Sequence, residues 1–302
     1  MIKLLKRKIA LFYFKHGNKR VLSIALMTIG SIVISFNGLV LRNIDVADNW
    51  TVIFFRAVSF SLAIFLFLLY KNRSRVFLKI TEVGLPGLLA GMALGIANIC
   101  FIMSMTMTKV ANTVFTISLI PFITALLAFF ILKENLSRIT IFTMIGALLG
   151  VFIMLQSALD SGDLLGNFLA LVTAISFSSF TLILRINKIL DMLPCLILSG
   201  LIAIVVSSFY KMGSIGIPIK DLLLCFLLGG FMSAFVNCSF VFATRHLLAG
   251  EATLFFFIEI SLSPIWVWLF ANELVAKNTL IGGLLILCSL LIRSFYLYTT
   301  SN

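Results

Sequence analysis

The chain has 302 residues, of which 61% belong to the hydrophobic set AVILMFWYC and only 11% are charged. Soluble domains carry about 25% charged residues, so this composition excludes an ordinary soluble protein and leaves no room for a sizeable soluble domain. The formal net charge of +12 would suggest a nucleic-acid partner in a soluble protein. In a membrane protein the distribution of that charge matters more than its sum.

Ten apolar runs, bounded by charged residues, Pro, Asn or Gly, predict ten transmembrane helices, because a helix needs about 20 apolar residues to cross a bilayer. The predicted spans are residues 21–41, 50–70, 83–107, 110–132, 138–156, 164–184, 192–210, 219–243, 247–271 and 278–298. With the N-terminus inside, seventeen Lys and Arg residues lie on the inner side and five on the outer side. Since basic residues are retained in the cytoplasm, we expect both termini there, with residues 1–20 as a basic cytoplasmic tail and no nucleic-acid partner.

The two halves of the chain, residues 21–156 and 164–298, match each other at an offset of 139 residues. The identical pairs are Gly91 and Gly230, Asn98 and Asn237, Phe101 and Phe240, and Glu134 and Glu273. Five spans per half is an odd number, so the halves must insert with opposite orientations. The sequence therefore predicts an all-α integral membrane protein of two inverted five-helix repeats, an architecture typical of secondary transporters with a site between the halves.

Two charged residues clearly lie at membrane depth in the predicted spans and require an explanation, because a charge at the bilayer centre costs at least ~2.5–3.5 kcal/mol. Glu259 lies near the middle of the ninth span, and Arg56 lies six residues after Trp50 in the second. Arg56 could contact a substrate or anchor the helix by reaching the interface. Glu259 could line a cavity or be a buried, neutral carboxyl. Because burial disfavours a carboxylate, Glu259 is also our candidate for proton coupling.

Asn98 and Asn237 occupy equivalent positions deep in the two halves. They could hydrogen-bond a substrate or join neighbouring helices. Phe101 and Phe240 follow them three residues later and are candidates for apolar cavity walls. Asn37, in the first span, is a weaker polar candidate. We expect the cavity to be lined by the first four spans of each half.

Small and kink-forming residues predict how the helices pack and bend. Gly87, Gly91 and Gly95 recur every four residues, which lets helix backbones approach closely in lipid. Pro121 and Pro264 each interrupt a predicted span and are hinge candidates, with a static kink as the alternative.

No motif of an enzyme is present, and we expect no catalytic residues, no metal site and no cofactor. The five cysteines lie in apolar runs without a CxxC pair, as small core residues do. They are Cys100, Cys195, Cys225, Cys238 and Cys288.

Two stretches, residues 109–134 and 250–283, resemble the signature regions of the drug/metabolite transporter superfamily, EamA type. In each half a Leu- and Phe-rich span ends at a Glu, here in Leu132-Lys133-Glu134 and Ala271-Asn272-Glu273. Further matches are Arg56 in FFRAVSF, and Glu259 with Pro264, Trp266 and Trp268. The resemblance implies ten helices in two inverted repeats, alternating access, and movement of small metabolites across a prokaryotic inner membrane.

The sequence thus predicts a multi-pass inner-membrane permease for a small solute, with an amino acid or another zwitterion as the candidate because Arg56 and Glu259 supply both charges. Its expected partners are that solute and the lipid bilayer, with protons as a hypothetical coupling ion; a homodimer is compatible with the sequence. The alternative from another class is a polytopic membrane scaffold or regulatory subunit without a transport cycle. A water-sized cavity that reaches Asn98, Asn237 and Glu259 would favour the transporter over a solidly packed scaffold.

Overall fold

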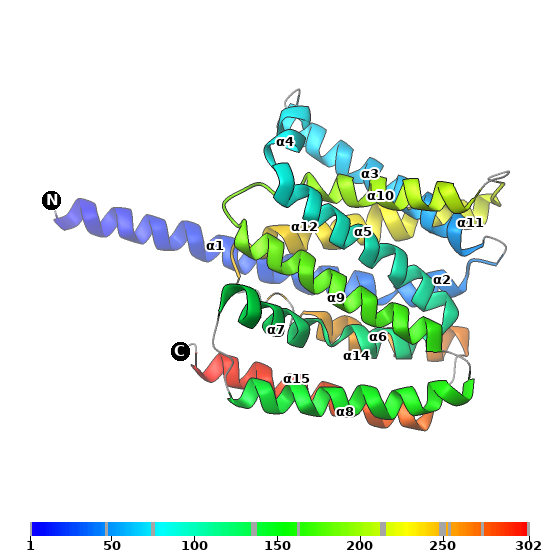
Figure 1. The fold of residues 1–302 in the computed structure, drawn as a ribbon. Helices are drawn as coiled ribbons and strands as arrows, with labels where there is room; N and C mark the ends of the chain where they lie inside the picture. The colour runs from blue at the N-terminus through cyan, green and yellow to red at the C-terminus, as the bar shows by residue number, and fades with distance from the viewer. Residues whose placement is uncertain are drawn as a thin grey trace.

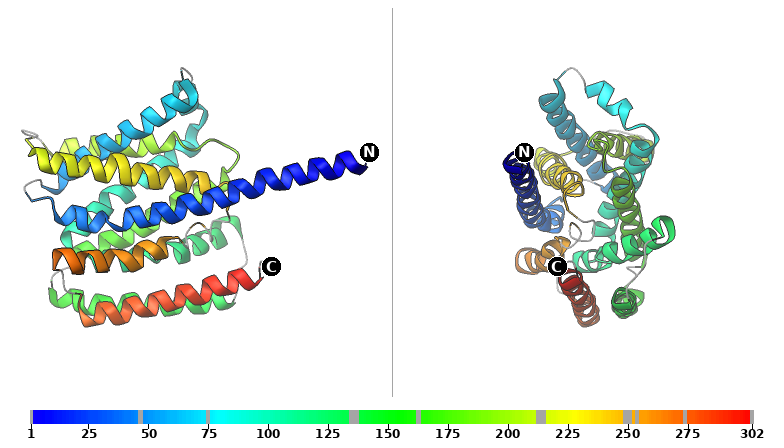
Figure 2. Two further views of the ribbon diagram at one scale, coloured as in Figure 1. Left: turned by 180° about the vertical axis from the view of Figure 1, so that it is seen from behind. Right: turned by 90° about the vertical axis from the view of Figure 1, so that its left-hand side faces the viewer.

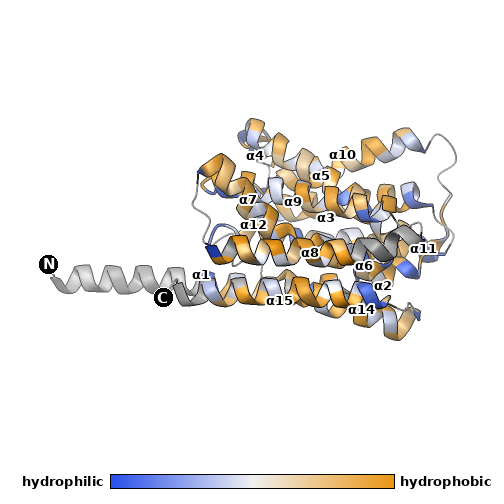
Figure 3. Ribbon diagram, turned by 60° about the horizontal axis from the view of Figure 1, so that its bottom comes forward, coloured by the Kyte–Doolittle hydropathy of each residue, from blue (hydrophilic) through white to orange (hydrophobic). Residues whose placement is uncertain are grey.

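The computed structural model describes residues 2–45, 48–73, 76–133, 138–161, 164–211, 216–247, 252, 255–272 and 275–300. All regular structure in these residues is helical, as predicted (Figure 1). Hydrophobic residues dominate the lengths of the helices, and hydrophilic residues gather mainly towards their ends (Figure 3). Glu134 and Glu273, the pair that closes the sequence repeat, lie outside the described residues.

Helices follow one another with short connections along the whole chain. The first half contains α1 (Ile2–Ser35), α2 (Asn37–Arg42), α3 (Asn49–Asn72), α4 (Val76–Glu82), α5 (Gly84–Met107), α6 (Val110–Ile117), α7 (Ile120–Leu132) and α8 (Arg138–Ser161). The second half contains α9 (Leu164–Ile186), α10 (Cys195–Tyr210), α11 (Ile219–Phe226), the π-helix η2 (Leu227–Ser233), α12 (Ala234–Ala243), α14 (Phe256–Ala271) and α15 (Lys277–Thr300). Residues 2–20, predicted as a separate tail, continue α1 as helix.

Six helical stretches in the described part of the chain are long and apolar enough to cross a membrane. They are Lys19–Arg42, Asn49–Asn72, Gly84–Met107, Val110–Leu132, Leu164–Ile186 and Ile219–Ala243. The other four predicted spans contain shorter apolar helices, Ile141–Ile153, Cys195–Tyr210, Ile258–Ala271 and Lys277–Ser289. The fold is therefore that of a multi-pass helical membrane protein. The six long stretches account for six of the ten predicted spans, and they do not by themselves show the other four.

The first and fourth predicted spans are interrupted within the described residues, and the sequence had singled out Pro121 as an interruption of the fourth. The first breaks at Phe36, between α1 and α2, where the Phe36 ring stacks on Trp266 of α14 with centroids 4.7 Å apart. The fourth breaks between α6 and α7, just before Pro121, which lacks the N–H needed to continue the helical bonding of α6. Pro264, by contrast, lies inside α14, which continues through it.

The helices pack side by side along one common direction, with a central group and an outlying pair (Figure 2). In the central group α5 packs against α9 and α10, α3 against α10 and η2, and α1 against α12 and α14. The outlying pair is α8 with α15. The start of α1 and the end of α15 lie at the same end of the bundle (Figures 1 and 2).

Ion pairs join the two ends of α3 to the residues that flank α10. At one end Lys71 lies 2.8 Å from Asp191, which also lies 3.5 Å from Arg245. At the other end Lys211 lies 2.8 Å from Asp48, whose carboxylate also caps α3. Burial alone would raise the pKa of Asp191, but its hydrogen bond to Lys71 and the charges of Lys71 and Arg245 outweigh that effect and lower the pKa.

Two of the three glycines in the predicted stripe of α5 bring that helix close to α10. A Cβ at Gly95 would lie 3.1 Å from the Ser199 carbonyl oxygen, and Gly91 is similarly close to α10. A Cβ at Gly87 would instead meet Val83, which precedes α5 in the same segment. The predicted close packing is thus found at Gly91 and Gly95, and Gly87 faces its own chain.

Substituting Gly91→Ala should destabilise the protein, because the new Cβ would lie 2.7 Å from the Leu198 Cβ and 3.1 Å from the Cys195 carbonyl oxygen. Overpacking of this kind costs roughly 1–3 kcal/mol. The control is Gly30→Ala, whose Cβ would meet Val236 at an ordinary 3.5 Å. Thermal unfolding of the purified variants in detergent measures the difference. Equal melting temperatures for the two variants would contradict the close contact of α5 and α10.

Candidate functional site

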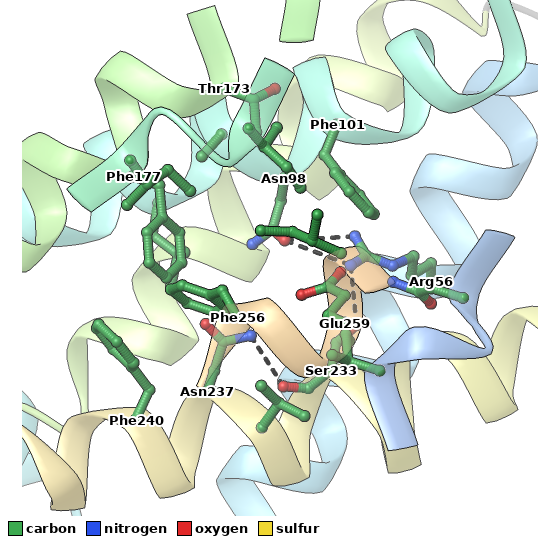
Figure 4. A pocket seen from close by; sticks show the side chains of 18 residues that line it. Arg56, Asn98, Phe101, Thr173, Phe177, Ser233, Asn237, Phe240, Phe256 and Glu259 are labelled. Carbon is green, nitrogen blue, oxygen red and sulfur yellow. Dashed lines mark hydrogen bonds between the residues drawn. The ribbon is translucent and has the colours of Figure 1, made fainter. Parts of the chain in front are cut away.

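A cavity of about 90 Å³ lies between the helices of the central group (Figure 4). Its lining comes from α1, α2, α3, α5, α6, α7, α9, η2, α12 and α14. A single water needs roughly 10–15 Å³ of such space, so the cavity has room for several water molecules or a small solute. The prediction that the first four spans of each half line the cavity is correct except for α10, which contributes no lining residue.

The six residues predicted to bind substrate all line this one cavity. They are Arg56, Asn98, Phe101, Asn237, Phe240 and Glu259. They come from α3, α5, α12 and α14, so the fold brings together side chains that are far apart in the sequence. The weaker candidate Asn37 lines the same cavity.

Arg56 is buried, with 7% of its surface exposed, and its guanidinium does not extend to the surface of the protein. Its Nη2 donates a 2.8 Å hydrogen bond to the Ser233 hydroxyl, and both Nη atoms lie 3.4 Å from the Asn98 Oδ1 (Figure 4). Among the described residues the Nε is buried without a hydrogen-bond partner. The hydrogen-bond partners of the guanidinium in this part of the chain are neutral acceptors.

Glu259 lies in the first turn of α14 and is 6% exposed. In the part of the chain that the structure describes, its carboxyl forms no hydrogen bond and no ion pair, with Arg56 or with any other residue. A guanidinium and a carboxyl group thus line one cavity without forming an ion pair with each other. Since an unpaired buried ion is costly, the arrangement suits a ligand or a proton that completes it.

The two equivalent asparagines have different partners. Asn98 accepts from Arg56 across the contact between α5 and α3. Asn237 donates from its Nδ2 to the Ser233 carbonyl oxygen at 2.9 Å, within its own helical segment. They do not bond each other, and both border the cavity (Figure 4).

Phenylalanine rings gather at one side of the cavity (Figure 4). The rings of Phe177, Phe240 and Phe256 lie with centroids 5.2–5.7 Å apart, and Phe180 packs behind them. Phe240 is only 1% exposed, whereas its repeat counterpart Phe101 is partly exposed. The equivalent phenylalanines of the two halves therefore occupy different environments.

Sequence reasoning missed Phe177 and Phe256 as lining residues. Phe256 precedes Glu259 by three residues, which puts both on one face of a helix, so its position could have been inferred. Phe177 carried no such signal, because α9 contains several phenylalanines and only the packing selects one. Asn37, beside the break at Phe36, is 3% exposed and its amide has no hydrogen-bond partner among the described residues.

Comparison with known proteins relates these features to a family. The model of the EamA-like transporter family matches residues 21–156. An uncharacterized transporter of Clostridium kluyveri is 29% identical over 196 residues, which cover 60% of this chain and 60% of that protein. A protein known from a crystal structure shares the fold with a TM-score of 0.67 over 92% of this chain and 98% of its own, at 13% identity.

The fold similarity extends through both halves, whereas the family match covers the first half, which supplies Arg56, Asn98 and Phe101 to the cavity. The resemblance expected from the sequence is thereby confirmed as a match of residues 21–156 to the EamA-like transporter family.

Proposed function

We propose that the protein is a secondary-active permease that moves a small zwitterionic metabolite, such as an amino acid, through the central cavity by alternating access. The observation that carries this proposal is that buried Arg56 and Glu259 line one cavity and form no ion pair there. A zwitterion brings a carboxylate for Arg56 and an ammonium group for Glu259. The solute would thus supply the countercharges that the protein leaves out.

The remaining lining residues suit the same solute. Asn98 and Asn237 would hydrogen-bond its polar end, and Phe101 and Phe240 would form apolar walls around its body. Small-molecule sites commonly combine apolar walls with a few converging polar groups. A cavity of this kind is hard to reconcile with the rival function, a membrane scaffold, because a scaffold gains nothing from two unpaired buried charges.

Two inverted five-helix repeats, and hence ten spans, are supported by the symmetry of the helix contacts. In the two halves α1 is equivalent to α9, α3 to α10, and α5 to the segment formed by η2 and α12. The contact between α5 and α9 therefore corresponds to the contact between α12 and α1. In the same way, the contact between α3 and η2 corresponds to the contact between α10 and α5. Likewise α1 packs on α14 as α9 packs on α6 and α7. Exchanging each element for its equivalent in the other half reproduces these contacts, as expected of repeats that can exchange conformations.

The different environments of Phe101 and Phe240 support alternating access. Phe240 packs against the rings of other phenylalanines. These rings lie towards the end of the bundle at which Lys71, Asp191 and Arg245 form ion pairs. Phe101, its counterpart in the other half, has no aromatic partner among the described residues. We take the end at Lys71 as cytoplasmic, because basic residues concentrate there, and the cavity as closed towards it. In the opposite state the two phenylalanines would exchange environments.

Glu259 is the proposed proton-coupling group, since a carboxyl without an ionic partner can change its protonation as its surroundings change. The helix break before Pro121 and the proline inside α14, Pro264, are the proposed points of bending during the cycle. We assign the protein to the inner membrane, with both termini in the cytoplasm.

The function is tested by flux into proteoliposomes across a panel of amino acids, with protein-free liposomes as the control. We expect concentrative flux of at least one amino acid. Its amine and its carboxylic acid analogues, which each lack one charge, should compete at least about tenfold less well, a difference of about 1.4 kcal/mol. Flux of some other solute, with none for any zwitterion, would overturn the assignment of substrate class.

Proton coupling is tested with Glu259→Gln, which keeps the shape of the side chain and removes its titration. We expect the variant to bind the solute less tightly, because Gln offers no negative charge to the ammonium group. At saturating solute it should still exchange solute across the membrane and should lose most of its response to an imposed pH gradient. Glu82→Gln is the matched control, because Glu82 is an exposed partner of Lys79 outside the cavity. Full concentrative transport by Glu259→Gln with an unchanged pH dependence would exclude Glu259 as the coupling group.

A further inference from the structure

The helical segment from α11 to α12 is continuous, but its middle turns, Leu227–Ser233, form the π-helix η2. Such π-segments are rare, are usually single insertions in an α-helix, and often occur at functional sites because they change the direction of side chains and free a backbone carbonyl. In this protein η2 packs directly against α3. The part of α3 that it contacts contains Arg56.

The backbone of Arg56 is fixed by two contacts with this segment. A Cβ at Gly229 would lie only 2.0 Å from the Arg56 carbonyl oxygen, so the absence of a side chain at Gly229 permits the approach. The Ser59 hydroxyl lies 2.9 Å from the Arg56 carbonyl oxygen and 3.2 Å from that of Cys225, and can donate to either. Ser59 thus connects α3 with the turn that leads into η2.

The guanidinium of Arg56 is held by the last residue of η2. Ser233 is 1% exposed, and its hydroxyl accepts the 2.8 Å hydrogen bond from the Arg56 Nη2. The Ser233 backbone carbonyl accepts from the Asn237 side chain, which fixes the position of Ser233 in turn. This is the shortest hydrogen bond of the guanidinium among the described residues, and its ionised donor makes it stronger than a neutral hydrogen bond. Its other contacts, with Asn98, are at 3.4 Å.

We propose that η2 holds Arg56 in place and that Ser233, which borders the cavity, is a positioning residue that aims the guanidinium into it. This inference rests on the proposed function, in which Arg56 contacts the carboxylate of the solute. Without the Ser233 hydroxyl the guanidinium keeps only the longer contacts with Asn98 and can turn away from the cavity. The solute would then bind less tightly, while its translocation would proceed once it is bound.

The test is the kinetics of proteoliposome uptake for the amino acid with the highest flux in the panel. We expect Ser233→Ala to raise KM about tenfold, equivalent to about 1.4 kcal/mol of binding, with a maximal rate within about twofold of the wild type. Ser239→Ala is the matched control, because Ser239 is also buried on α12 and donates only within its helix, to the Phe235 carbonyl oxygen. Its KM should be unchanged.

A double-mutant cycle with Arg56→Lys separates positioning from a structural role. If Ser233 acts through Arg56, then Ser233→Ala should raise KM by less than about twofold in the Arg56→Lys background. An equal increase in both backgrounds, or no increase in the wild-type background, would overturn the inference. An unchanged KM for Arg56→Lys would instead show that Arg56 does not contribute to solute binding. That result would overturn both the inference and the part of the proposed function that assigns the solute carboxylate to Arg56.

Melting temperatures accompany every kinetic measurement, because loss of a buried hydrogen bond also lowers stability. Should Ser233→Ala fail to fold, Ser233→Cys keeps the size of the side chain with a much weaker acceptor, and the same increase in KM is expected. A normal KM for a folded Ser233→Cys variant would overturn the positioning role.

Discussion

The cost of burying ionic groups in a membrane protein is the constraint on which the structure depends. Arg56 and Glu259 lie in a chain that is otherwise overwhelmingly apolar, and each is more than nine-tenths buried. An isolated buried ion costs several kcal/mol even after relaxation, and the usual remedy is an ion pair. Here the two groups line the same cavity and do not pair. In the function that we propose, the solute completes the electrostatic balance of this site.

The packing of the helices maintains this separation. Close contacts at glycines bring α5 against α10 and η2 against α3, and the π-turn of η2 provides a neutral acceptor for the Arg56 guanidinium. Glu259 is carried by a different helix, α14, which begins beside the cavity. The cavity therefore depends on the irregular parts of the fold, the π-helix and the interrupted helices, and less on the long regular spans around them.

Much of the fold and of the candidate site could be predicted from the sequence, because apolar runs mark the segments that can cross a bilayer and buried charges mark the residues that need an explanation. The apolar runs predicted most helix positions to within a few residues, although α1 begins well before its predicted span and α14 well after the start of its own. The cost of burial singled out Arg56 and Glu259 without any knowledge of the fold. The repeat pair Asn98 and Asn237 followed from spacing alone. The break at Phe36 and the π-turn did not, since neither contains a proline and both depend on contacts with distant segments. The position of Phe177 in the cavity wall could not be predicted either, because nothing in a phenylalanine-rich sequence distinguishes a ring that lines a cavity from one that faces lipid.

The central claim is that a zwitterion completes the charges of Arg56 and Glu259, and the most direct measurement is a cryo-EM structure of the protein with a transported amino acid bound. The account predicts the solute in the central cavity, its carboxylate within about 3.2 Å of the Arg56 guanidinium and its ammonium group beside Glu259. A solute bound elsewhere, or a direct ion pair between Arg56 and Glu259 in the occupied protein, would contradict it.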